Sequence, residues 1–367
     1  MNEVNVVPEE KKSIYSFTLA ELRAHLGCRG MAKFAADQIY NWIYKKFSLN
    51  VDEWTNIAAQ TRQYIKEEME TDLPEVVWTA KSVDGTRKFL LKMKDGHTVE
   101  AVAIPAKDRL TLCVSSQVGC AIGCAFCHTG TMGFIRHLKS EEVVGEYMAI
   151  QQWLELNEKT GERFTNMVYM GQGEPLHNFD NMKKATEIFM EPKGLNYGQR
   201  KITLSTSGLI PQIEKLVDFP PVNIAISLHA AHSEIRSELM PINKIYDLHR
   251  LLDAIKKIPL KAHRRITYEY LLVDGMNDRI QDVEALTRLL DKKRSKINLI
   301  PFNDYPGSRF KRPSDERIQW FMDQLLSRGF HCTLRISKGQ DILAACGQLK
   351  SAFENKKLNT WEDIEKN

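Results

Sequence analysis

The chain has 367 residues, seven cysteines and a formal net charge of +4, a length that suits one large domain or two modest ones. Hydrophobic residues make up 43% and charged residues 27%, which excludes collagen, coiled coils and largely disordered chains. No run of eighteen apolar residues predicts a membrane helix. The start, Met1-Asn2-Glu3, does not resemble a signal peptide. We therefore expect a cytoplasmic protein whose cysteines serve metal binding or catalysis rather than structural disulfides.

The first segment, residues 1–75, has a helical pattern. Thr18 is followed three residues later by Glu21, which is the spacing of a capping box at the start of a helix. Apolar residues at helical spacing predict two further helices, at 35–47 and 52–69. We predict a helical accessory domain here.

The next segment, residues 76–107, has the pattern of β-strands. Two β-rich runs, at 88–93 and 98–104, flank Asp95-Gly96, a pair that is typical of tight hairpin turns. The sequence therefore predicts a β-hairpin extension between the helical domain and the rest of the chain.

Residues 108–350 alternate β-rich runs with helical stretches, which predicts a parallel sheet. About six repeats are near the number that begins to close into a barrel. We predict an α/β fold, a partial (βα)6-type TIM barrel, with a doubly wound open sheet as the alternative and a tail at 351–367. Ser140–Leu154 and Asp247–Ile258 are clear helices that begin with good N-cap residues. The expected strands are 110–115, 166–170, 201–205, 222–227, 265–272, 296–300 and 331–336.

The most specific motif follows the first of these strands, where Cys120, Cys124 and Cys127 form a CxxxCxxC loop. Structural zinc sites usually have four ligands in two separated pairs, and the second pair is missing here, although His128 could be a fourth ligand. A 4Fe-4S cluster held by three thiolates leaves one iron open to a substrate. We favour the iron-sulfur cluster over zinc, and both over unliganded thiols.

Polar groups also follow later strands, and parallel strands bring such groups to one rim. Gly173 and Glu174 follow the second strand, where glycine admits a close approach by a ligand and the carboxylate can pair with an ammonium group. Taken singly, each rim residue has an ordinary explanation as a turn former, strand cap or core histidine. Their shared position favours one ligand site. The residues after the third, fourth and sixth strands are Ser205, Ser227, Leu228, His229 and Asn303.

With Phe126 before its third cysteine, the CxxxCxxC motif resembles the radical S-adenosylmethionine (SAM) superfamily. Nearly the whole chain is similar to the RlmN/Cfr family of radical SAM RNA adenosine methyltransferases. Gly-Glu-Pro-Leu at 173–176 and Ile-Pro-Phe-Asn at 300–303 resemble the branch that methylates carbon 2 rather than carbon 8 of adenine. The matching blocks are 119–136, 170–178, 204–208, 226–230, 240–243, 268–270, 274–278, 298–303 and 341–349.

The resemblance implies a cytoplasmic enzyme that forms 2-methyladenosine at adenosine 2503 of 23S rRNA and at adenosine 37 of some tRNAs. The alternatives are methylation at carbon 8 and a non-catalytic, zinc-stabilised RNA-binding protein. The resemblance also implies a 4Fe-4S cluster on the three motif cysteines, SAM beside the rim residues, and an electron donor of the flavodoxin or ferredoxin type. We expect a monomer with no membrane partner.

The resemblance gives roles to three residues outside the motif. Cys346, in a segment of small residues, would accept a methyl group from one SAM before a second SAM supplies a radical. Glu100 would remove the carbon 2 proton, although strand alternation equally permits a solvent-facing carboxylate there. Cys113 would then attack the sulfur of Cys346 and leave a transient disulfide. The ordinary alternative for both cysteines is a small buried side chain.

Basic residues would have to hold the RNA phosphates. They concentrate at 256–265, 292–296 and 311–312, although such side chains are usually only solvated.

Overall fold

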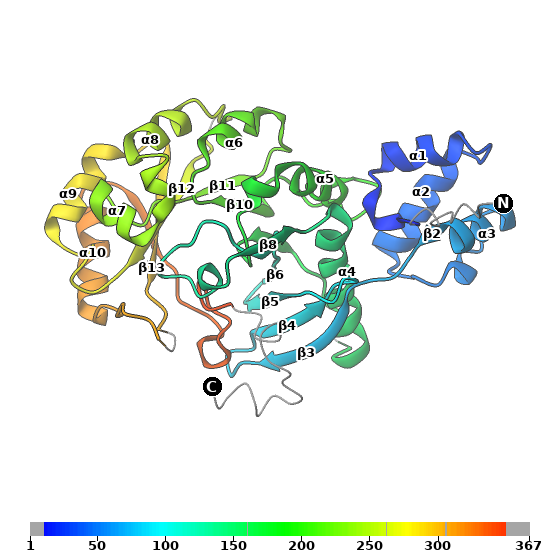
Figure 1. The fold of residues 1–367 in the computed structure, drawn as a ribbon, viewed down its shortest axis with the longest axis horizontal. Helices are drawn as coiled ribbons and strands as arrows, with labels where there is room; N and C mark the ends of the chain where they lie inside the picture. The colour runs from blue at the N-terminus through cyan, green and yellow to red at the C-terminus, as the bar shows by residue number, and fades with distance from the viewer. Residues whose placement is uncertain (1–10, 160, 262, 305–306, 350–367) are drawn as a thin grey trace, which may run out of the picture.

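A computed structural model describes residues 11–159, 161–261, 263–304 and 307–349, so the predicted tail at 351–367 lies outside the described residues. Figure 1 shows a helical N-terminal region beside a larger α/β body. The body contains a ten-stranded sheet in the order β14-β13-β12-β11-β10-β9-β6-β5-β4-β3. Within the described ranges, no helix combines the length and apolar character needed to cross a membrane.

Seven parallel strands form most of this sheet, and each corresponds to a predicted strand. Helices return the chain between successive strands (Figure 1). The two end strands of the order, β14 and β3, are not paired with each other in the described part of the chain. The sheet is therefore an open, partial barrel, as predicted. The parallel strands are β6 (Arg109–Cys113), β9 (Asn166–Tyr169), β10 (Ile202–Thr206), β11 (Asn223–Ser227), β12 (Ile266–Leu272), β13 (Ser295–Pro301) and β14 (His331–Leu334).

The two helices that the sequence predicted in the body are present as α4 and α8. Asp247 is the N-cap of α8 and accepts hydrogen bonds from the next turn, as predicted. The other predicted cap was wrong by one residue, because Lys139 is the N-cap and Ser140 is already helical. The longer helices are α4 (Ser140–Asn157), α5 (Phe179–Met190), α8 (Leu248–Lys256), α9 (Ile280–Leu289) and α10 (Asp315–Ser327), and the shorter ones are α6 (Ile210–Glu214) and α7 (Ser233–Leu239).

The predicted hairpin is confirmed as β4 (Arg87–Lys92) and β5 (Thr98–Ala106). It continues the sheet, because β5 pairs antiparallel with β6 and brings Val102 beside Cys113. The sequence did not reveal β3 (Glu75–Lys81). Its side chains are partly exposed on both faces, so no clear alternation marks it as a strand.

The N-terminal region contains α1 (Leu19–Gly27), α2 (Phe34–Tyr40) and α3 (Ala59–Glu68). The predicted capping box is present, since Thr18 and Glu21 exchange hydrogen bonds of 2.8 and 3.2 Å. The helix predicted from residue 52 was wrong at its start. Trp54 is 1% exposed and donates its indole N–H to the Ser48 carbonyl at 3.1 Å, which turns the chain before α3 begins.

After β14 the chain crosses to the opposite end of the strand order. Asp341 accepts hydrogen bonds from the Ser82 hydroxyl at 2.6 Å and the Val83 amide at 3.1 Å. Asp84 in turn accepts one from the Gly339 amide at 3.0 Å. This C-terminal segment, residues 339–349, therefore joins the two sides of the partial barrel and carries the predicted Cys346 with it (Figure 1).

Candidate active site

A cavity of about 160 Å³ lies at the C-terminal ends of the parallel strands. Its walls come from the cysteine loop, from the ends of β9 to β13 and from the C-terminal segment. The structure therefore brings most of the predicted residues together. Those that line the cavity are Cys120, Cys124, Cys127, Gly173, Glu174, Ser205, Ser227, His229 and Cys346.

The cysteine loop connects two short antiparallel strands, β7 (Gln117–Gly119) and β8 (Phe134–His137). The Cys120 amide donates a hydrogen bond of 2.7 Å to the Gly133 carbonyl where the strands cross. Gly119 has a φ of +74°, and a Cβ there would lie 2.0 Å from that carbonyl oxygen. Only glycine permits such a close approach of the two strands, and this approach fixes where the loop begins.

Burial raises the pKa of all three motif cysteines, and for Cys120 the value reaches about 12. The nearby thiols Cys127 and Cys120 raise the pKa of Cys124 further. Three neighbouring thiolates in a buried cavity are unfavourable unless a cationic group compensates their charge. The donor set therefore fits a metal centre bound by thiolates.

No three His, Cys, Asp or Glu side chains in the described ranges converge on a point for a single metal ion. A 4Fe-4S cluster does not need three side chains that converge on one point, because each thiolate binds a different iron.

Glu174 is 3% exposed and is held from two sides. Its carboxylate accepts hydrogen bonds from the Leu176 amide at 3.0 Å and the Ser207 amide at 2.7 Å. Burial nevertheless raises its pKa, so a cationic ligand would favour the ionised form. The preceding Gly173 has a φ of +96°, and a Cβ there would lie 2.5 Å from the Gln117 side chain. The carboxylate is thus fixed in the cavity wall, where it could pair with a cationic group.

His229 is both a core residue and part of the cavity wall. Its Nδ1 accepts a hydrogen bond of 3.1 Å from the Leu271 amide, and its ring meets Phe126 edge-on at 4.8 Å. Burial lowers its pKa to about 3, with a smaller effect from Arg236. The imidazole is therefore neutral at physiological pH and can act only through neutral hydrogen bonds or contact.

Two predicted rim residues lie outside the cavity wall. Leu228 is fully buried, and its carbonyl accepts a hydrogen bond of 3.1 Å from Arg236. Asn303 donates a hydrogen bond of 3.1 Å to the Cys346 carbonyl. Neither residue is part of the wall of this cavity, and their predicted role in ligand binding stays a prediction.

A second cavity, of about 110 Å³, has both Cys113 and Cys346 in its wall. Burial raises the pKa of Cys113 to about 12, and the nearby Cys346 raises it further. All seven cysteines are free thiols in this structure. Cys346 thus borders the first cavity on one side and a neighbouring thiol on the other.

Glu100 does not face solvent, so that alternative was wrong. It is 4% exposed and forms an ion pair of 3.3 Å with Lys88, which is equally shielded from water. Lys88 also donates a hydrogen bond of 3.3 Å to the Leu343 carbonyl. The carboxylate is thus tied through one lysine to the segment that carries Cys346.

The sequence did not reveal two arginines at the site, the buried Arg236 and the half-buried Arg335. Arg335 borders both cavities, and its main electrostatic partner is Cys346. Arg236 donates hydrogen bonds to the carbonyls of Ser207, Ser227 and Leu228 and so ties together the ends of two strands. Arg335 directly follows β14, so the strand-end rule used for the other strands would have found it.

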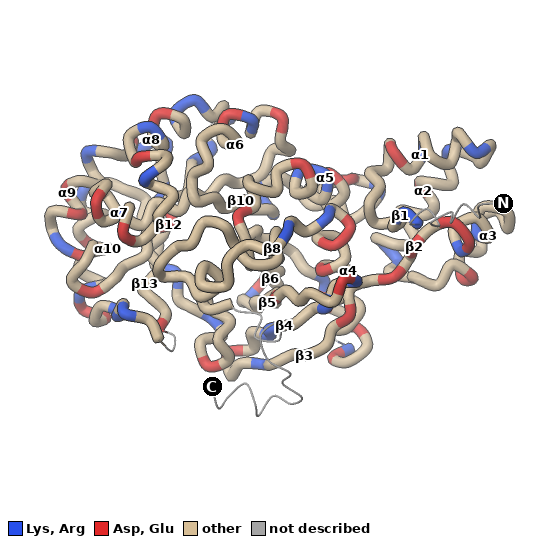
Figure 2. The backbone as a smooth tube through the Cα atoms, in the orientation of Figure 1, with Lys and Arg blue, Asp and Glu red and all other residues tan. Residues whose placement is uncertain are grey.

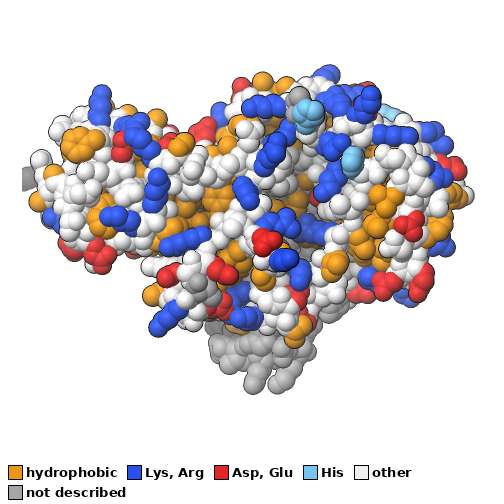
Figure 3. All heavy atoms as spheres, turned by 180° about the vertical axis from the view of Figure 1, so that it is seen from behind, with side chains coloured by type: hydrophobic (Ala, Val, Ile, Leu, Met, Phe, Trp, Pro, Cys, Tyr) orange, Lys and Arg blue, Asp and Glu red, His pale blue; other side chains and the backbone are white. Residues whose placement is uncertain are grey.

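Two of the predicted basic segments, 256–265 and 292–296, meet at the end of the sheet that lies opposite the candidate active site. A surface cavity there, before β12 and β13, is lined by Lys261, His263, Arg264, Arg265, Lys293 and Arg294, together with Leu260. Figure 3 shows Lys and Arg gathered around histidines on that face, whereas basic and acidic residues are mixed on α8 to α10 (Figure 2). These bases lie at the N-terminal ends of the strands, away from the catalytic rim.

Comparisons with known proteins agree with this site. Residues 114–290 match the model of the radical SAM superfamily, and residues 13–71 match that of the ribosomal RNA large subunit methyltransferase N-terminal domain. The dual-specificity RNA methyltransferase RlmN of Bdellovibrio bacteriovorus is 42% identical over 96% of this chain and 87% of that protein. The chain belongs to the RlmN family. The RlmN of Syntrophotalea carbinolica is also 42% identical, over 95% of this chain and 92% of that protein.

A solved radical SAM methyltransferase from Sphaerobacter thermophilus shares the RlmN-family fold, with a TM-score of 0.86 and 39% identity over 92% of this chain and 99% of that chain. The predicted family, fold class and radical methyltransferase class are thereby confirmed. Membership of the radical SAM superfamily implies a 4Fe-4S cluster and SAM, which favours iron over the zinc alternative.

The buried histidine gives a test by pH. Because the pKa of His229 is about 3 when folded and about 6.5 when unfolded, the unfolded chain binds the proton more readily. Stability is therefore lost as the pH falls below about 6.5, by about 2 kcal/mol at about pH 5. His229→Asn, which tolerates the φ of +58° at this position, lacks this loss.

The stability advantage of the wild type over the variant, from urea unfolding, should therefore shrink by about 2 kcal/mol between about pH 7.5 and about pH 5. A difference that does not change with pH would contradict the burial of a neutral imidazole.

Proposed function

We propose that this protein transfers a methyl group from SAM to carbon 2 of adenosine, at adenosine 2503 of 23S rRNA and adenosine 37 of some tRNAs. The observation that carries the proposal is the position of Cys346 between the cavity of the motif cysteines and the cavity that holds Cys113. The two RlmN relatives are dual-specificity RNA methyltransferases, which supports two classes of RNA substrate.

Cys120, Cys124 and Cys127 would hold the 4Fe-4S cluster, and the buried Glu174 would pair with the amino group of SAM. Ser205, Ser227 and His229 line the remaining wall of the same cavity. When bound, the cluster and SAM supply the 5′-deoxyadenosyl radical, which is needed because carbon 2 lies between two ring nitrogens and is too electron-poor to attack SAM directly. Leu228 and Asn303 stay predicted SAM-binding residues, and they also hydrogen-bond to neighbours of the cavity, Arg236 and the Cys346 carbonyl.

Cys346 would carry the methyl group as S-methylcysteine. Its thiolate attacks the SAM methyl carbon in a polar substitution, and the carbon–sulfur bond of SAM breaks. Arg335 borders the same two cavities as Cys346, so its guanidinium lies close to the reacting sulfur. The hydrogen bond from Asn303 to the Cys346 carbonyl holds the loop in place for this attack.

Glu100 would be the base that takes the carbon 2 proton. Before this, the S-methyl group would lose a hydrogen atom to the 5′-deoxyadenosyl radical and its carbon would join the adenine. The adduct also gives up one electron, for which the cluster would supply the acceptor. The burial of Glu100 against Lys88 supports a positioned carboxylate rather than a solvated one. A positioned base contributes roughly 100- to 10,000-fold to such a step. Glu100 lies outside both cavity walls, so the bound adenine would have to reach toward β5.

Cys113 would release the product. Its thiolate attacks the sulfur of Cys346, the bond between sulfur and the methylene carbon breaks, and a disulfide between the two cysteines remains. An external dithiol or reductase must then reduce it. The buried position of Cys113 keeps its pKa high, so this thiol would lose its proton only during the reaction, as the released methylene carbon takes up a proton and becomes the methyl group.

The same proposal covers the organisation of the chain. We infer a helical RNA-binding domain over 1–75, a hairpin extension over 76–107, a catalytic barrel over 108–350 and a tail over 351–367. The enzyme would act as a cytoplasmic monomer with an electron donor of the flavodoxin or ferredoxin type.

The site of methylation is tested by the product. The protein, carrying its cluster under anaerobic conditions, should convert unmodified 23S rRNA fragments and tRNA to 2-methyladenosine. Mass spectrometry of the digested RNA, with 2-methyladenosine and 8-methyladenosine as standards, checks this. Formation of 8-methyladenosine alone would contradict the proposed regiochemistry, and SAM-independent RNA binding without any product would contradict the enzyme.

The roles of the two thiols are tested by separate variants. Cys113→Ala should retain methyl transfer to Cys346 but trap a covalent RNA–protein adduct, visible as a shifted band on a denaturing gel. Cys346→Ala should give neither adduct nor product. Cys28→Ala is a matched control, because Cys28 is an exposed thiol in the N-terminal region. Loss of methylation without adduct in both variants would contradict the assignment.

A further inference from the structure

Three aromatic side chains gather just outside the catalytic cavity. The ring of Phe134 lies 5.1 Å from that of His137 and 5.4 Å from that of His177, and the two imidazoles meet edge-on at 4.8 Å. Phe134 is 40% exposed, and both histidines are partly exposed. An exposed ring of this size on a folded protein usually marks a contact surface when it forms a cluster.

The cluster lies between two openings. On one side, His177 comes two residues after Pro175 in the wall of the catalytic cavity, and Phe134 follows Gly133, which holds Cys120. On the other side, His137 lines a large cleft, of about 1110 Å³, between the N-terminal helical region and the body. One ring of the cluster thus lines the cleft, and the cluster contacts the wall of the catalytic cavity through Gln117, which accepts a hydrogen bond from the Glu174 amide.

Gln117 fixes the two histidines as neutral rings. Its side-chain oxygen accepts a hydrogen bond of 2.8 Å from the Glu174 amide, so its nitrogen must be the atom that faces the imidazoles. That nitrogen lies 3.0 Å from Nδ1 of His137 and 3.1 Å from Nδ1 of His177. Since an amide N–H donates, both Nδ1 atoms accept and each ring carries its hydrogen on Nε2. Neutral aromatic faces of this kind suit nucleobases.

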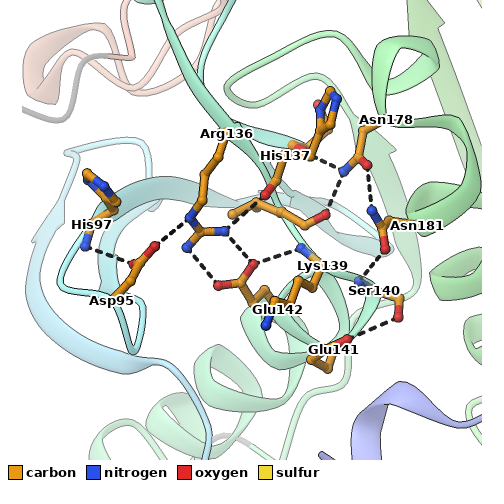
Figure 4. A network of polar contacts seen from close by, with 12 residues as sticks. Asp95, His97, Arg136, His137, Lys139, Ser140, Glu141, Glu142, Asn178 and Asn181 are labelled. Carbon is orange, nitrogen blue, oxygen red and sulfur yellow. Dashed lines mark hydrogen bonds and ion pairs between the residues drawn. The ribbon is translucent and has the colours of Figure 1, made fainter. Parts of the chain in front are cut away.

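The strand that carries Phe134 and His137 is firmly held (Figure 4). Arg136 donates to Asp95 at 2.5 Å and to both carboxylate oxygens of Glu142 at 2.7 and 2.8 Å. These contacts tie β8 to the β4–β5 turn and to α4. The amide of Asn178 donates to the Leu138 carbonyl at 2.6 Å. The rings are therefore preorganised, which lowers the entropy cost of binding a ligand.

We propose that Phe134, His137 and His177 form a platform on which a nucleobase next to the target adenosine stacks. The inference rests on the RNA substrate proposed above. An adenosine that enters a cavity must leave its stack, so its neighbours lose a stacking partner. Aromatic side chains replace such partners in single-stranded RNA recognition. The cleft is lined by both acidic and basic residues, so stacking rather than phosphate attraction would place the RNA here.

The test is a double-mutant cycle that combines one change in the protein with one change in the RNA. The full-length protein, with its cluster and SAM, binds an RNA hairpin with the target adenosine in its loop, either intact or with an abasic nucleotide on the 5′ or the 3′ side. Fluorescence anisotropy gives the affinities. Phe134→Ala should weaken binding of intact RNA roughly 5- to 150-fold. For one of the two abasic RNAs the same substitution should cost less than about threefold, because the stacked base is already missing.

Two control variants make the result specific. Ile135→Ala removes the adjacent side chain of equal exposure, 42%, and should change binding by less than about threefold. Phe134→Trp keeps an aromatic face and should bind like the wild type. The platform is overturned if Phe134→Ala weakens RNA binding no more than Ile135→Ala does. It is also overturned if Phe134→Ala causes the same loss of affinity for the intact RNA and for both abasic RNAs. Failure of the proposed function would show instead as absence of 2-methyladenosine from the wild-type reaction, a separate readout.

Discussion

The arrangement of the site depends on one connection, the return of the C-terminal segment across the open side of the partial barrel. The segment starts beyond β14 and is fastened to the β3–β4 turn by carboxylates, Asp84 and Asp341, that accept hydrogen bonds across the gap. Without this crossing, Cys346 would have no fixed relation to either the motif cysteines or Cys113. The extra strands β3 to β5 thus give the segment an anchor as well as extending the sheet.

Buried charge is the second constraint. The rim combines thiols, carboxylates and arginines in positions with little access to water, and such groups are costly unless they are paired. Arg335 lies beside Cys346, and Lys88 lies beside Glu100. The motif cysteines and Glu174 have raised pKa values because their protein surroundings compensate them only in part. In the proposed function, the cluster and the SAM ammonium group would supply the missing positive charge.

The sequence predicted the parts of the fold that leave local patterns. Seven parallel strands, the β4–β5 hairpin and the Thr18 capping box all have a period or spacing that survives in isolation. It could not predict features that depend on distant contacts. The burial of Glu100 needs Lys88 and the C-terminal segment, and the early turn at Trp54 needs its contact with Ser48. The sequence also could not distinguish residues in the cavity wall from neighbours that lie outside it, such as Leu228.

The central claim is that Cys346, which borders both cavities, carries the methyl group and then reacts with Cys113. The most direct measurement is peptide mapping by mass spectrometry of the wild-type enzyme after one turnover on RNA. The cluster is reduced beforehand by its one-electron donor, no dithiol is added, and free thiols are blocked during quenching. The account predicts one new cross-linked peptide that joins Cys113 to Cys346 in an amount equal to the methylated RNA. Methylated RNA with both thiols still free, or Cys346 joined to another cysteine, would contradict it.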